Sequence, residues 1–400
     1  MISQHLHKLA HNAGSFGRTL LMSLFLVACG GGVESGGTGG NATASYVSGP
    51  ITGFGSVIVG GVRFDDATAT VADAEGDARS RDDLKLGMTI TVRGTPIVGD
   101  GSSAATSIVV GSAIVGPVSA INSGAATMTV LGQPVDVLTT TVFDESLAGG
   151  LAALSVGDVV EVYALLDTAT QRYRATRIER KRVALVYQLR GVVTNLNTEN
   201  STFKVGNQGI SYDALSDSDV PVGLANGSIV RVVLRIVPVA GLREALRLRL
   251  GVTAPRDLEE VRIEGLISAF ESSAVFSVDG VQVDAARASF PDGTAGLAVG
   301  ARVALRGAVN NGVLSATQVQ IKSESQVEDD GFELRGLIAN IDTMARLFTL
   351  RGVSVDYSGP VEYRDGTQAD LVIPNVEVEV EGRLSSDGTR LVATRIEFRR

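Results

Sequence analysis

The sequence predicts an all-β protein that consists of five small five-stranded barrels in tandem, preceded by a signal peptide and a flexible tether. Three observations support this fold class. Glycine supplies 47 of the 400 residues and tryptophan is absent, a composition typical of short strands joined by tight turns. Val376, Val378 and Val380 alternate with glutamates, as in a strand with one face in a core. The same order of strands and turns recurs along the chain, which indicates repeated modules.

Residues 1–29 have the features of a secretory signal peptide. Lys8 and Arg18 precede an apolar run at residues 20–28, which is too short to span a bilayer as a mature helix. Cys29, the single cysteine of the chain, follows this run directly. The predicted attachment to a membrane depends on Cys29.

The segment Leu26-Val-Ala-Cys29-Gly30 resembles the lipobox of bacterial lipoproteins. This resemblance implies that the thiol of Cys29 carries a diacylglycerol, that the leader is cleaved before it, and that the new N-terminus receives a fatty acid such as palmitate. Several acyl chains would anchor the protein stably in a membrane. Glycine after the cysteine, in place of aspartate, resembles the sorting signal for the outer membrane of Gram-negative bacteria. The alternatives are a plain secretory signal with an incidental cysteine, or a free buried cysteine.

Residues 30–48 form the predicted tether. This stretch is rich in glycine and serine and contains too little apolar surface to offset the entropy lost on ordering. We therefore expect a flexible connection between the lipid anchor and the first module.

Five copies of one pattern follow the tether, and each begins with a glycine that heads an apolar strand. The opening glycines are Gly49, Gly116, Gly191, Gly265 and Gly336. A second glycine in each copy is followed, four residues later, by an aspartate. These copies define modules at residues 49–113, 114–185, 186–258, 259–327 and 328–400.

Each copy predicts a meander of three strands, a longer connection without a convincing helix, and a closing hairpin. A module of this size would be marginal as an open sheet, and closure into a barrel removes the exposed edges. The order of strands is that of an OB-type barrel; the alternative is a pair of packed sheets. We expect each module to contact chiefly its neighbours in sequence. Phe203, Phe276 and Phe348 should point inward, which leaves no aromatic platform for stacking.

The repeated glycine and valine pattern resembles a known family. Its elements are a Gly-x-Val opening, a middle segment such as Phe276-Ser-Val-Asp-Gly-Val-Gln-Val283, a Leu-x-x-Gly-x-x-Val-x-Val-x-Gly strand, and an Ala-x-x-Ile ending. Together they are similar to the bacterial lipoprotein module called domain of unknown function 5666. The resemblance covers most of residues 49–400 and is best in the second, fourth and fifth copies. It implies a module and an envelope location, but no reaction and no catalytic residue.

The composition excludes several classes of function. His5, His7 and His11 are the only histidines, and all lie in the predicted leader. Ser-His-Asp triads, Cys-His pairs and histidine-ligated metal sites are therefore excluded from the mature chain, and we expect neither a catalytic residue nor a cofactor. The formal charge is −9, and removal of Lys8 and Arg18 with the leader would make it −11. Nucleic acid is accordingly not an expected partner.

The aspartate that recurs in every copy is the one candidate metal ligand. A calcium site needs six to eight oxygen ligands, and no Asp-x-Asp-x-Asp-Gly loop surrounds any of these aspartates. The alternative is that each carboxylate accepts backbone N–H groups in the turn after the third strand. The five residues are Asp65, Asp136, Asp213, Asp284 and Asp356.

Residues 172–182 form a basic run in an otherwise acidic chain. Such a run is a candidate contact for lipid phosphates or for an anionic polymer. The alternative is the solvated outer face of a strand, where charges also discourage pairing between edges. The residues are Arg172, Arg174, Arg177, Arg180, Lys181 and Arg182.

The sequence thus predicts a non-catalytic lipoprotein of the cell envelope, anchored to the outer membrane through Cys29. Its modules would serve as a binding or scaffolding array for an envelope polymer or protein, because several weak contacts add up through effective concentration. One alternative is a carboxylate-dependent hydrolase of an envelope polymer, which requires two acids about 5–10 Å apart, one of them with a raised pKa. The other is calcium-dependent adhesion, in which calcium would raise the melting temperature.

Overall fold

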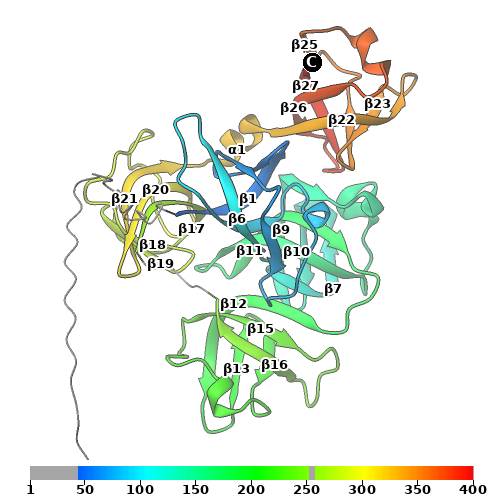
Figure 1. The fold of residues 1–400 in the computed structure, drawn as a ribbon. Helices are drawn as coiled ribbons and strands as arrows, with labels where there is room; N and C mark the ends of the chain where they lie inside the picture. The colour runs from blue at the N-terminus through cyan, green and yellow to red at the C-terminus, as the bar shows by residue number, and fades with distance from the viewer. Residues whose placement is uncertain (1–43, 252–256, 400) are drawn as a thin grey trace, which may run out of the picture. The chain divides into compact units, whose positions relative to one another are not determined.

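The computed structural model describes residues 44–251 and 257–399. This part of the chain is mostly β-structure and contains one α-helix, α1 (Glu324–Asp330) (Figure 1). The predicted signal peptide, Cys29 and residues 30–43 of the predicted tether lie outside the described residues. Within the described part, no helix combines the length and the apolar character needed to cross a membrane.

The strands form small five-stranded barrels, as the repeats predicted. In the second copy, β7 pairs with β8, β8 with β9, β11 with β10, and β10 with β7, all antiparallel, while β9 and β11 pair in parallel. The ring is therefore closed by strands in the order first, second, third, fifth, fourth. The bounds are β7 (Ile114–Asn122), β8 (Thr127–Val130), β9 (Gln133–Phe143), β10 (Val159–Asp167) and β11 (Arg172–Arg180).

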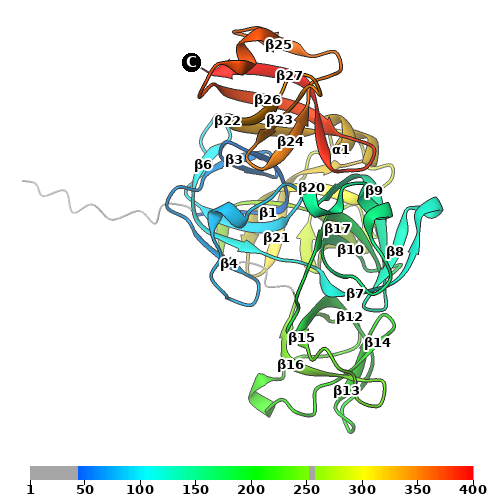
Figure 2. The same cartoon turned by 90° about the vertical axis from the view of Figure 1, so that its right-hand side faces the viewer.

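The other copies have rings with the same order of pairing. In the first copy the ring strands are β1 (Ser45–Phe54), β2 (Val57–Val59), β3 (Val62–Asp65), β5 (Thr89–Gly94) and β6 (Ser102–Val110). In the third copy they are β12 (Tyr187–Asn197), β13 (Thr202–Val205), β14 (Gln208–Ser211), β15 (Ile229–Leu234) and β16 (Arg243–Leu250). Figure 2 shows these five strands in green from a second direction.

The fourth and fifth copies complete the series. The fourth ring consists of β17 (Leu258–Ser272), β18 (Val275–Val278), β19 (Val281–Asp284), β20 (Arg302–Asn310) and β21 (Val313–Ile321). The fifth consists of β22 (Phe332–Asp342), β23 (Leu347–Leu350), β24 (Val353–Asp356), β26 (Glu377–Leu384) and β27 (Arg390–Arg399). Two short strands, β4 (Thr70–Asp73) and β25 (Glu362–Arg364), each add a parallel pairing to the last strand of their own ring.

A β-bulge interrupts the fifth strand of every ring where it pairs with the fourth, because one residue of the fifth strand is skipped in the pairing. The register shifts at Gly94, Ala164, Leu234, Gly307 and Gly382. In three copies the residue is glycine because a Cβ atom would lie 2.2 to 2.8 Å from a carbonyl oxygen of the facing strand. In these three copies the glycine accommodates the close approach of two backbones, whereas Ala164 and Leu234 occupy the same place in the second and third copies.

The interior of each barrel is filled by apolar side chains. Phe203, Phe276 and Phe348 occupy the same place in the second strand of their rings and are at most 2% exposed. Met128 takes that place in the second barrel and is 3% exposed. The prediction that these phenylalanines point inward is confirmed, so they are not available as a stacking platform.

Two predicted boundaries are wrong. Strand β1 begins at Ser45, inside the predicted tether, because Ser45 and Val47 are fully buried between β5 and β17. Helix α1 spans the predicted boundary between residues 327 and 328. The signal for this helix is present in the sequence, since Ser323 and Gln326 form a capping box at its N-terminus.

The first barrel also pairs with barrels that are distant in sequence. Residues 45–48 of β1 pair in parallel with residues 260–263 of β17, and Gly53 and Phe54 pair with β22. The second and third barrels, which are neighbours in sequence, also pair with each other, through the antiparallel strands β7 and β12. The expectation that each module contacts chiefly its sequence neighbours is therefore wrong for the first barrel. Strand β1 has ten residues and uses backbone groups left over from its own ring to pair with β17 and β22.

Candidate functional site

The five repeated aspartates lie in separate barrels, each in or just after a third strand. In three of them the carboxylate accepts the N–H of the residue two positions later, which agrees with a role in the turn. These three are Asp65, Asp284 and Asp356, with N–H to oxygen distances of 2.9 to 3.0 Å. Asp136 instead accepts hydrogen bonds from Arg172, and Asp213 donates its own N–H to Ser211 at 3.4 Å.

The basic run forms strand β11, and most of its charges are paired with carboxylates. Arg177 is almost fully buried and lies 2.6 Å from Glu179. Only Arg182, beyond the end of the strand, is exposed without a carboxylate partner in the described part of the chain. Strand β11 is therefore not a free cationic surface. The other pairs are Arg172–Asp136, Arg174–Asp167, Arg174–Glu324, Arg177–Asp144, Arg180–Asp158 and Lys181–Glu161.

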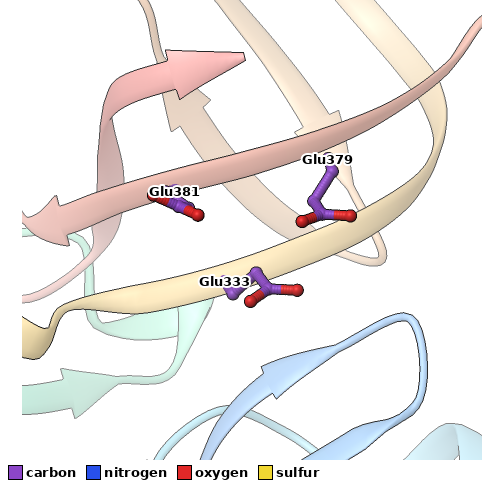
Figure 3. Close-up of side chains that lie close together, drawn as sticks. All are labelled: Glu333, Glu379 and Glu381. Atoms are coloured by element: carbon purple, nitrogen blue, oxygen red, sulfur yellow. The ribbon is translucent and has the colours of Figure 1, made fainter. Parts of the chain in front are cut away.

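Three glutamates form the one group of carboxylates close enough to share a cation among residues 44–251 and 257–399. Glu333 lies on β22, and Glu379 and Glu381 lie on β26 of the same barrel, with oxygens within 4.8 Å of one another (Figure 3). Each carboxylate, however, has its own arginine. The pairs are Arg63–Glu333, Arg399–Glu379 and Arg395–Glu381. These arginines neutralise the negative charge of the three carboxylates, so the cluster does not require a metal ion to balance its charge.

A cavity of about 420 Å³ is a candidate binding site in the described part of the chain. Four arginines line it, and they come from the first barrel and from three strands of the third. They are Arg93 on β5, Arg190 on β12, Arg231 on β15 and Arg249 on β16. Strand β17 contributes Glu264, and the turn between β18 and β19 contributes Asp279. Arg93 and Arg249 are exposed, so the cavity reaches solvent at these side chains.

Arg190 and Arg231 are the buried members of this group, with side chains 14% and 11% exposed. Arg231 donates one hydrogen bond, from Nη1 to the carbonyl oxygen of Ser112 at 2.7 Å. The nearest carboxylate oxygen, Oε1 of Glu75, is 4.0 Å away, and the other oxygen of that carboxylate, Oε2, lies 3.5 Å from Arg247. Both guanidinium groups therefore retain donors that the protein does not engage.

Burial sets the ionisation of the charged groups in the cavity. It lowers the pKa of Arg231 to about 10, and the charge of Arg190 acts in the same direction. Burial also raises the pKa of Asp279, and Arg190 partly offsets that rise. The Oδ1 atom of Asp279 has no hydrogen-bond partner and lies 3.8 Å from Nη2 of Arg190. Arg190 is thus the shared neighbour of the two perturbed groups.

Glu264 and Asp279 place two carboxyl groups at this cavity, one of them with a raised pKa. The hydrolase alternative requires such a pair. Glu264, however, accepts two hydrogen bonds from Arg302, at 2.6 and 2.9 Å. With that carboxylate engaged and four arginines around it, the cavity is better suited to hold an anion than to protonate a leaving group.

Sequence reasoning missed this cavity. The predicted site residues do not line it, and the arginines that do line it lie in different copies of the repeat. Each of them occupies a strand position where a charged side chain is ordinary. The pairings of β1 with β17 and of β7 with β12 bring them together, and no local sequence pattern signals those pairings.

Three segments of the chain, residues 115–179, 264–320 and 335–397, match the model of the family described as domain of unknown function, DUF5666. No curated protein sequence matches the chain. A solved structure described as Drosophila Unr CSD456 aligns over 53% of this chain and 97% of its own, with 13% identity and a TM-score of 0.14, too low to support an argument. The matched segments are the second, fourth and fifth barrels, and they show that the chain has a repeated architecture of the DUF5666 type.

Proposed function

We propose that this chain is a non-catalytic lipoprotein of the bacterial cell envelope, in which five tandem barrels form a binding or scaffolding array. The observation that supports the proposal best is the recurrence of one closed ring with an interior filled by apolar side chains. Such interiors leave no room for a substrate, so the surfaces and the junctions of the barrels remain for partners. An envelope polymer or an envelope protein is the expected partner.

The proposed location depends on Cys29 and its acyl chains. A predicted leader, a lone cysteine and a glycine-rich tether precede the first strand, and together they support lipid attachment at the outer membrane. The tether would let the barrels reach a partner at some distance from the lipid surface.

Replacement of the acylated residue tests the anchor. We expect Cys29→Ala to move the full-length protein from the membrane pellet to the soluble fraction of a Gram-negative host, and to abolish labelling by a palmitate analogue. Ser35→Ala, in the predicted tether, is the matched control and should remain in the pellet with its label. A Cys29→Ala protein that stays in the membrane fraction would contradict the proposed attachment.

A retention experiment with envelope components tests whether the barrels form a binding array. Purified full-length protein on beads should retain a polymer or protein from a detergent-treated envelope fraction without shortening it. The hydrolase alternative keeps one supporting observation, the pair formed by Glu264 and Asp279. Time-dependent release of new reducing ends or peptides from the retained polymer, lost in Asp279→Asn, would establish that alternative and overturn the non-catalytic function.

A further inference from the structure

We propose that the cavity lined by Arg190 and Arg231 binds a multiply charged oxyanion, a phosphate group present either as the free ion or as a monoester. The tandem-array function does not require this site, so either proposal can fail while the other stands. The inference rests on the charges of the cavity, on its hydrogen-bond donors and on its size.

The cavity has an excess of positive charge. Arg93, Arg190, Arg231 and Arg249 line it. Glu264 is held by Arg302 at 2.6 Å, and its charge is compensated there. Asp279 is the remaining carboxylate of the lining, and Glu75 lies behind Arg231, where it also interacts with Arg247. A singly charged ligand would leave much of this excess uncompensated, so a multiply charged anion is favoured.

The buried arginines have donors to offer. A guanidinium carries five N–H groups, and Arg231 makes a single hydrogen bond to the protein. Arg190 makes one long contact, from Nε to the carbonyl oxygen of Gly251 at 3.5 Å. Buried charges are normally paired and hydrogen-bonded. The planar fork of arginine matches the oxygens of phosphate, which makes phosphate the natural partner of two such groups.

The size of the cavity allows a ligand larger than the ion alone. A volume of about 420 Å³ lies in the range of small-molecule sites. Ile90, Leu165 and Val281 add apolar surface to the lining. A phosphate monoester could therefore place its charged group at the arginines and its organic part against these side chains.

The first experiment measures phosphate binding by the full-length protein with isothermal titration calorimetry at constant ionic strength. We expect saturable binding of inorganic phosphate, weakened at least about tenfold in Arg231→Gln, since a hydrogen bond to a charged group contributes about 1.5–3 kcal/mol. Arg249→Gln, at the exposed mouth, should weaken binding less. Arg364→Gln removes an equal charge from β25, which does not line the cavity, and should bind like the wild type.

Three outcomes of this titration would overturn the proposal. They are no saturable binding of phosphate, equal weakening by Arg364→Gln, and unchanged affinity in both Arg231→Gln and Arg249→Gln. A parallel titration with glucose 1-phosphate identifies the source of the group. Tighter binding of the ester than of the ion assigns the site to a monoester, and equal binding assigns it to the free ion.

The melting temperature in phosphate-free buffer separates a ligand-binding arginine from a structural one. Burial lowers the pKa of Arg231 from its usual value to about 10, so the protonated side chain opposes folding at neutral pH, and this penalty begins to decline only as the pH rises above about 10. Arg231→Gln removes this penalty together with the hydrogen bond to Ser112, so the melting temperature should not fall, while the response to phosphate is lost. A large drop without phosphate would assign Arg231 a structural role and contradict the site.

Replacement of the cavity carboxylate should have the opposite effect on affinity. We expect Asp279→Asn to tighten phosphate binding severalfold, because it removes the negative charge that lies 3.8 Å from Arg190. Asn tolerates the left-handed backbone at this position, where φ is 50°. Asp100→Asn, at an exposed turn that does not line the cavity, serves as the control and should not change the affinity. Weaker binding in Asp279→Asn would contradict an anion at this site.

Discussion

Phe348→Ala should destabilise the barrel of residues 332–399 by about 3–5 kcal/mol. The ring of Phe348 is 1% exposed and packs against Tyr357 with a centroid distance of 5.7 Å. Its removal leaves a cavity that neighbouring strands cannot fill, because the closed ring holds them at fixed spacing. Hydrogen exchange of peptides from residues 332–399 measures the effect, since a chain of several barrels does not unfold in one two-state transition.

Tyr357→Phe is the control for this change. It keeps the aromatic contact and removes only a hydroxyl, so the free energy of hydrogen exchange should change much less than in Phe348→Ala. If Phe348→Ala leaves the protection of β23 and β26 intact, the fifth copy does not have the core described above.

Gly382→Ala should destabilise the same barrel by about 2 kcal/mol or more. A Cβ atom at Gly382 would lie 2.3 Å from the carbonyl oxygen of Val392 on the facing strand. Because the obstacle is backbone, the strands must separate at the bulge and lose hydrogen bonds on either side of it. The unfolding of this barrel, followed by hydrogen exchange or by chemical denaturation, reports the loss.

Gly336→Ala provides a matched control within the fifth barrel. The nearest atom to a Cβ at this position is Cγ of Arg351, at 3.5 Å, which is an ordinary contact. The backbone of Gly336 also lies outside the left-handed region. This variant should be as stable as the wild type, and equal destabilisation by both substitutions would show that the bulge is not the cause.

The sequence predicts the interior of each barrel well because burial there follows the local alternation of side chains. Val378 and Val380 are fully buried, as their alternation with glutamates indicated. The sequence also shows that a glycine recurs at the end of this strand. It does not show why, because the clash that this glycine avoids involves the carbonyl group of another strand. Local patterns thus identify the strands and leave the contacts between backbones undetermined.

The cavity could not be predicted for a related reason. Arg190 and Arg231 occupy strand positions where an arginine normally faces water, and the repeat gives no sign that this face becomes buried. Their burial depends on which barrels meet, and that choice is made by the long β1 and by β7 and β12. The start of β1 was misplaced for the same reason, because Ser45 is ordered by its partners and not by its own composition.

The double pairing of β1 has a mechanical consequence. Residues 45–48 are hydrogen-bonded on one side to β5 and on the other to β17. Tension applied through the chain that precedes Ser45 therefore acts along the strand and loads both ladders at once, in shear. Bonds loaded together share the force, whereas a hairpin at a free edge would open one bond at a time. The strand nearest to the proposed lipid anchor is consequently well placed to withstand pulling.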